Sequence, residues 1–64
     1  MIMTIHAEVT SIEKDDMLGY ARIEFPVGHH APVQGTASGC TSARQALLDS
    51  VGAAFDSLAK KQGS

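Results

Sequence analysis

The chain has 64 residues, with seven acidic side chains against five basic ones and a formal net charge of −2. A chain this short forms one domain at most and buries only about 60% of the surface that its unfolded form exposes. Its single cysteine excludes an intrachain disulfide and fits a reducing compartment. The scattered cations disfavour nucleic acid as a partner, because phosphate binding needs clustered Lys and Arg.

The start of the chain carries no targeting signal that we recognise. The first 13 residues lack Lys and Arg, and no long apolar run follows them, as a signal peptide would require. No apolar run is long enough to cross a bilayer. We therefore expect a cytoplasmic protein without a membrane partner.

Two strands are expected in the first half of the chain. Residues 5–10 alternate strictly between apolar and polar side chains, which predicts a half-buried strand. Ile12 breaks this alternation, so the strand ends or bulges near Ser11. After a polar turn at 13–16, residues 18–25 alternate again until Pro26, and the short connection predicts a hairpin.

A third strand and a helix are expected in the second half. A loop over 27–32 leads to a weak strand over 33–39, whose small inward residues suit the close approach of a helix. Thr41 or Ser42 caps this helix, and Ser42 with Gln45 fits a capping box. The inward side is predicted to be one apolar stripe, formed by Leu47, Val51, Ala54, Phe55 and Leu58.

These elements predict a single α+β domain over residues 1–64. Its sheet is three-stranded and mainly antiparallel, and one C-terminal helix packs on one face, in the order βββα. Residues 61–64 are expected to form a frayed tail.

A line of small residues beside the apolar stripe is a candidate interface. Small side chains permit another backbone to approach closely, although mildly solvated positions would give the same pattern. Since short chains often gain stability from a partner subunit, we expect a homodimer. The helix contact is preferred over pairing of two exposed strand edges. The expected contact residues are Ala46, Ser50, Ala53 and Ser57.

The polar face of the sheet is the second candidate surface, because one helix covers only one face. It carries a Tyr and an Arg, types that are enriched at contact surfaces, although an ordinary solvated face is the alternative. The two histidines of the 27–32 loop are also placed to contact a partner. We expect a larger protein or protein complex to bind Glu8, Tyr20, Arg22, Glu24, His29 and His30.

Residues 35–47, GTASGCTSARQAL, pose a choice between a phosphate loop, a reactive cysteine and a simple strand-to-helix corner. A Walker loop needs a Lys directly after its second glycine, and none follows Gly39. Cys40 precedes the helix start, but a nucleophile needs a base, and only His29 or His30 is near in sequence. The corner is the preferred interpretation, with no catalytic residue and no cofactor.

Four residues are able to bind a metal: His6, His29, His30 and Cys40. Their spacing matches no zinc pattern. The sequence therefore predicts no metal site.

The run VQGTASGCTSARQAL, residues 33–47, resembles the last strand and helix entry of two βββα modules. One is the N-terminal module of HicB-type antitoxins, and the other is the C-terminal part of double-stranded-RNA-binding domains. The RNA-binding domains have a Lys-rich helix start, where this chain has Ser42, Ala43 and Arg44. In size, acidity and lack of a catalytic motif, the chain is also similar to small phage-encoded inhibitors, anti-CRISPR proteins among them.

Together these observations predict a non-enzymatic protein-binding module. It would act as a small inhibitor or regulator that blocks a larger partner by occlusion, in the manner of an anti-CRISPR protein or an antitoxin. A nucleic-acid-binding βββα module is the alternative. A thiol- or metal-dependent site at His29, His30 and Cys40 is the third hypothesis.

Overall fold

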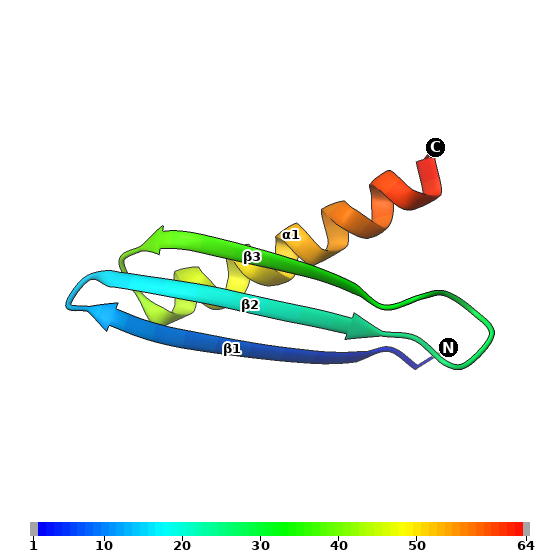
Figure 1. Cartoon of the computed structure of the whole chain (residues 1–64), viewed down its shortest axis with the longest axis horizontal. Coiled ribbons are helices and arrows are strands. Elements are labelled where there is room, and N and C mark those ends of the chain that lie inside the picture. The colour runs from blue at the N-terminus through cyan, green and yellow to red at the C-terminus, as the bar shows by residue number, and fades with distance from the viewer. Residues whose placement is uncertain (1, 64) are drawn as a thin grey trace.

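The computed structural model describes residues 2–63, with side chains for residues 2–61. Three strands, β1 (Thr4–Glu13), β2 (Asp16–Glu24) and β3 (Val33–Cys40), precede one helix, α1 (Ala43–Gly63). The strands form one antiparallel sheet in the order β1-β2-β3, and α1 packs on one face of it (Figure 1). The predicted α+β fold in a single small domain is confirmed.

The β1–β2 hairpin has the register that the alternation predicted. Ile5 pairs with Ile23 on the helix side of the sheet, and the register shifts between Ser11 and Glu13. The predicted irregularity near Ser11 is therefore confirmed as a bulge, after which the strand continues to Glu13. The turn that follows holds Asp15 at a φ of 62°, a left-handed conformation that Asp tolerates better than most residues.

Strand β3 runs one residue beyond its predicted end. Its register against β2 shifts between the Gly19–Ala37 and Met17–Cys40 pairs. Gly39 stands in this irregularity with a φ of 67°, which favours glycine. The extra residue returns Cys40 to the helix side, where it is buried.

The start of α1 confirms the predicted cap. The backbone N–H of Gln45 donates to Ser42 Oγ at 3.1 Å, so Ser42 is the N-cap residue. The Gln45 side chain reaches back and accepts the backbone N–H of Thr41 at 3.0 Å. The two side chains thereby satisfy two backbone donors at the helix entry, as in a capping box.

The side of α1 that faces the sheet consists of small residues. Ala46, Ser50 and Ala54 are fully buried, at 0% exposure. They meet glycines of the sheet: a Cβ on Gly35 would lie 2.6 Å from the Ser50 carbonyl oxygen and even closer to the Ala54 nitrogen, and a Cβ on Gly19 would clash with the Ala46 carbonyl. The helix backbone therefore rests directly on the strand backbones.

This close contact corrects two predictions. The apolar stripe does not face the sheet squarely: Val51 and Leu58 are half-buried at the margin of the core, and Leu47 and Phe55 are exposed. The line of small residues does receive another backbone, but the backbone belongs to the chain's own sheet. The predicted dimer contact is therefore wrong at Ala46 and Ser50, which are fully buried against the sheet. The other two predicted contact residues, Ala53 and Ser57, are half-buried beside them.

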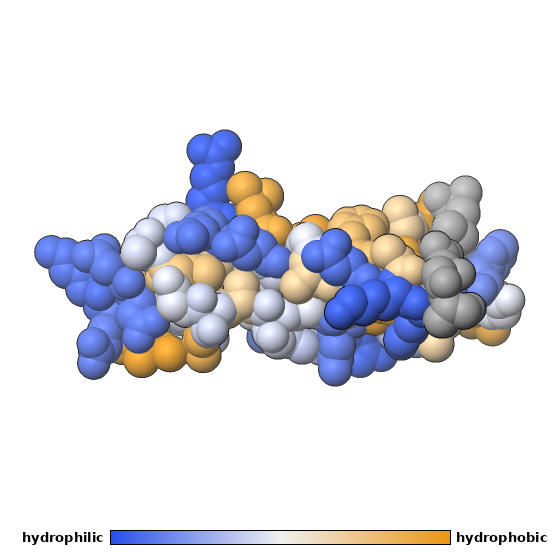
Figure 2. Space-filling view, turned by 90° about the horizontal axis from the view of Figure 1, so that it is seen from above, coloured by the Kyte–Doolittle hydropathy of each residue, from blue (hydrophilic) through white to orange (hydrophobic). Residues whose placement is uncertain are grey.

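The helix crosses the sheet at an angle, so that it covers the strands unequally. In Figure 1, α1 starts behind the hairpin end of the sheet and its C-terminal turns extend past β3, away from β1. The N-terminal half of β1 stays open on its helix side, where Ile5 is 46% exposed although its neighbour Ile23 is at 0%. Figure 2 shows that hydrophilic residues gather at the end with the β1–β2 turn, while hydrophobic residues reach the surface along the molecule.

Helix α1 includes residues 61–63, which overlap the predicted frayed tail, and Ser64 lies outside the described residues. Fraying of residues 61–64 stays a prediction. No helix within residues 2–63 combines the length and apolar character needed to cross a membrane.

Candidate functional site

The face of the sheet opposite α1 carries polar side chains from all three strands, as the alternation predicted. Cross-strand pairs hold them in rows; one row is Glu8, Tyr20 and Thr36, and the next is His6, Arg22 and Gln34. We call this surface the open face, and its members are His6, Glu8, Thr10, Leu18, Tyr20, Arg22, Glu24, Gln34, Thr36 and Ser38.

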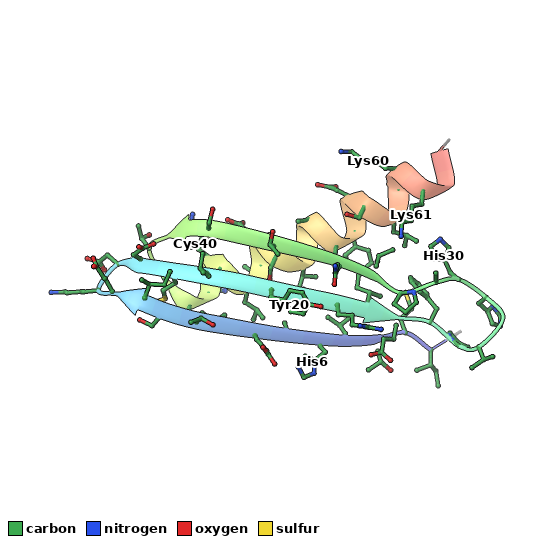
Figure 3. The ribbon with its side chains drawn as sticks, in the orientation of Figure 1. His6, Tyr20, His30, Cys40, Lys60 and Lys61 are labelled. Atoms are coloured by element: carbon green, nitrogen blue, oxygen red, sulfur yellow. The ribbon has the colours of Figure 1, made fainter. Side chains whose placement is uncertain are left out.

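Tyr20 lies near the middle of the open face, on the central strand (Figure 3). Its hydroxyl donates a hydrogen bond to Gln34 Oε1 at 2.8 Å, and its side chain is half-buried. This bond joins β2 to β3 across the face. The ring is therefore held in one orientation while part of it remains available to a ligand.

The charges of the open face alternate in sign. The Nε2–H of His6 donates to Glu8 Oε1 at 3.1 Å, and Arg22 Nε lies 3.5 Å from Glu24 Oε1. All four side chains are exposed, so these contacts add little to stability. Their effect is to spread charge of both signs over the face, which therefore lacks a basic patch.

A hollow of about 300 Å³ opens beside Tyr20. Pockets for small molecules occupy about 300–1,000 Å³, so this hollow lies at the low end of that range. It suits one protruding side chain of a partner better than a small molecule enclosed on all sides. Its lining residues are Glu8, Thr10, Leu18, Gly19, Tyr20, Thr36, Ala37 and Ser38.

The two loop histidines lie apart from this hollow, in the connection between β2 and β3. The backbone N–H of His29 donates to the Pro26 carbonyl at 3.1 Å, which closes a turn. The His30 ring packs on Phe25 with centroids 5.2 Å apart, and its Nδ1–H donates to the Ala31 carbonyl at 2.6 Å. Four of the six predicted partner-binding residues thus share the open face, and His29 and His30 stand at its end.

The third hypothesis, a site shared by the loop histidines and Cys40, finds no support in this arrangement. Cys40 lies at the opposite end of β3 from His30 (Figure 3). The eight residues of β3 separate them by roughly 25 Å at ~3.3 Å per residue. Cys40 is buried and its Sγ lies 3.8 Å from the Ser38 carbonyl oxygen. Within the part of the chain that the structure describes, no group of three His, Cys, Asp or Glu side chains is placed to hold a metal ion.

The stretch from Gly35 to Leu47 is a strand-to-helix corner, as the preferred interpretation had it. Gly35 lies under the helix, and Gly39 occupies the bulge that ends β3. The helix entry is capped by the side chains of Ser42 and Gln45.

The hollow beside Tyr20 was not foreseen from the sequence. One feature of the sequence did point to an unusual spot on this face. Leu18 is two residues from Tyr20 and so lies on the same face of the sheet, where it is 39% exposed among polar neighbours. The small residues Gly19 and Ala37 also line it. Which small residues border an open hollow depends on the strand register, which composition does not reveal.

Comparison of the chain with known protein families, with curated proteins and with solved structures found no match.

Proposed function

We propose that the chain is a non-enzymatic protein-binding module whose open face binds a larger protein and blocks it by occlusion. One observation carries this proposal: Tyr20 is oriented by Gln34 at the centre of the sheet face opposite α1, beside a hollow. Occlusion requires only a contact surface, so the open face needs no catalytic group to block a partner.

The physical argument concerns the cost of binding. Tyr residues in well-packed pockets supply a large share of interface energy. A side chain already fixed by a hydrogen bond loses less conformational freedom when a partner arrives. The alternating charges of Glu8, Arg22 and Glu24 add specificity, because a partner must present the complementary pattern.

The same charges favour a protein over a nucleic acid. Arg22 is the one Lys or Arg of the open face, and Glu24 already lies beside it. Glu8 and Glu24 repel phosphates, whereas nucleic-acid binding depends on releasing counterions with several cations. Nucleic-acid binding is therefore the alternative function, and the binding test must be able to detect it.

The proposed biological role is that of an inhibitor or regulator of the antitoxin or anti-CRISPR kind, which would use such a face. A cytoplasmic location fits the free thiol of Cys40.

The test is a comparative capture from host lysate, with mass spectrometry, using three forms of the chain. We expect wild type and the control Asp56→Ala, on the polar flank of α1, to retain a protein that Tyr20→Ala does not retain. Titration of that isolated partner should then show at least a tenfold loss of affinity for Tyr20→Ala, provided that circular dichroism confirms its fold. Equal retention by all three forms would contradict the proposal, and micromolar binding of DNA or RNA at about 150 mM salt would favour the alternative.

A further inference from the structure

The two edges of the sheet are protected to different degrees. At β3, Pro32 precedes the strand, Gly39 forms a bulge near its end, and Ser57 Oγ donates to the Gln34 carbonyl at 3.3 Å. Proline, bulges and covering elements are among the devices that keep an edge from pairing. Over residues 4–10, β1 has none of these, and its bulge comes only after Ser11.

An apolar surface adjoins the unprotected edge. Ile5 is 46% exposed on the helix side of β1, and Met3, just before the strand, is 42% exposed. Figure 3 shows Lys60 on the side of α1 away from β1, and Val51, nine residues earlier, lies half a helical turn round from it. The flank of α1 that includes Val51 and Leu47 therefore faces the β1 side.

We propose that a second copy of the chain occupies this edge. Two β1 strands pair antiparallel about a two-fold axis at Ala7 and form one six-stranded sheet with both helices on the same face. The uncovered half of each β1 then lies beside the hairpin end of the other copy, where the partner's α1 begins. This arrangement is self-complementary, as a two-fold interface must be.

Three features of β1 favour this register: the face on which each side chain lies, the regular part of the strand before its bulge, and the residues that would meet on the open face. Centring on Ala7 pairs residues 4–10 of both copies, the part of β1 before its bulge. On the helix side, Ile5 meets the partner's Val9. On the open face, His6 meets the partner's Glu8, whereas the neighbouring registers of the same parity would pair His6 with His6 or Glu8 with Glu8.

The need for a partner follows from the size of the core. Among the fully buried side chains, the large apolar ones are Ile23 and Val33, and the rest are small. Short chains with so little buried apolar volume commonly gain stability from association. A standard interface buries about 800 Å² per partner, roughly a fifth of the 4462 Å² that this chain exposes.

Sedimentation equilibrium at tens of micromolar tests the dimer, and cysteine cross-linking tests its register. In a Cys40→Ala background, Ala7→Cys should form a disulfide-linked dimer under mild oxidation, because directly opposite Cα atoms lie about 4.5–5.5 Å apart. Val9→Cys should not cross-link, since its twin would be about 13 Å away along the strand. A mixture of Ile5→Cys and Val9→Cys chains should give the mixed dimer.

A monomeric wild type at 100 µM would overturn the proposal. A dimer in which Val9→Cys links and Ala7→Cys does not would also overturn it, because another register or surface would then hold the copies together. Circular dichroism of each variant before oxidation shows that the fold is intact.

Discussion

The β3 side and the β1 side of this molecule are built on opposite principles. Under α1, β3 offers Gly35 and the helix offers Ser50 and Ala54, so the two backbones touch and little side-chain volume separates them. On the β1 side, Ile5 and Leu47 are large, apolar and exposed. The small residues fix where the helix lies, and the large residues are left at the margin. Hydrophobicity alone does not decide which residues enter a core, because shape on the facing strand selects among them.

The largest expected effect comes from filling the β3 side. Gly35→Ala would place a Cβ against the Ala54 nitrogen and 2.6 Å from the Ser50 carbonyl oxygen, all backbone atoms that cannot rotate away. We expect the free energy of unfolding to fall by more than about 3 kcal/mol, which leaves so small a domain unfolded. Circular dichroism with urea titration measures it.

Gly52→Ala is the matched control for that substitution. No atom lies within 4 Å of a Cβ at Gly52, and the residue is exposed on α1. Because Ala is favoured over Gly in a helix by about 1 kcal/mol, this variant should be more stable than wild type. If Gly35→Ala were as stable as Gly52→Ala, the tight helix–sheet contact described above would be wrong.

A second prediction compares one residue type across the boundary. Ile23 and Ile5 are directly paired on the same face of the sheet, at 0% and 46% exposure. Ile23→Ala should reduce stability by about 2–5 kcal/mol, the usual range for a buried Ile. In dilute protein, Ile5→Ala should cost less than about 1 kcal/mol, because Ile5 already touches water.

Protein concentration sharpens this second prediction. Thermal melts at about 1 and 100 µM should show Ile5→Ala becoming more costly at the higher concentration, where the second copy covers Ile5. Ile23→Ala should show no such trend in its added cost. A constant cost for Ile5→Ala across this range would count against the β1 interface.

The smallest expected effect concerns charge along the free edge. His6→Glu would place a carboxylate directly opposite Glu8 of the partner subunit. The two-fold axis repeats this like-charge pair, so the dimer would contain two of them. Since a cross-strand charge pair contributes about 0.2–1 kcal/mol, the dimer dissociation constant should rise about fivefold. Sedimentation equilibrium measures it, and the increase should shrink in high salt.

His6→Lys is the control for this last prediction. It places a cation opposite Glu8 of the partner subunit, so its dissociation constant should not rise above that of wild type. Equal weakening by both variants would show that the effect comes from losing the histidine and not from charge.

Much of the fold was predictable from the sequence, because local rules specify it. Alternation gave the strands, the parity break at Ile12 gave the bulge, and Ser42 with Gln45 gave the helix start. The side of α1 that packs was predicted only in part, because the stripe from Leu47 to Leu58 is the more hydrophobic one but only its Ala54 is fully buried. Gly19 and Gly35 select the adjacent line of small residues, and their effect requires knowing which strands lie under the helix.

The open face was predictable in the same way, and its finer features were not. Parity placed Glu8, Tyr20 and Arg22 together, as the cross-strand register shows. The bond from Tyr20 to Gln34 and the hollow beside it depend on alignment between β2 and β3, which the sequence does not specify. The loop histidines could be placed near the sheet but not on either face.

The small residues between α1 and the sheet also set how stability responds to temperature. The heat-capacity change of unfolding grows with the apolar area that becomes exposed, at about 0.45 cal/mol/K per Å². Ala46, Ser50 and Ala54 hide little such area against Gly19 and Gly35. The heat-capacity change should therefore fall below the usual value of about 12–15 cal/mol/K per residue. We therefore expect the stability curve of this protein to be broad and shallow, with little difference between cold and warm conditions.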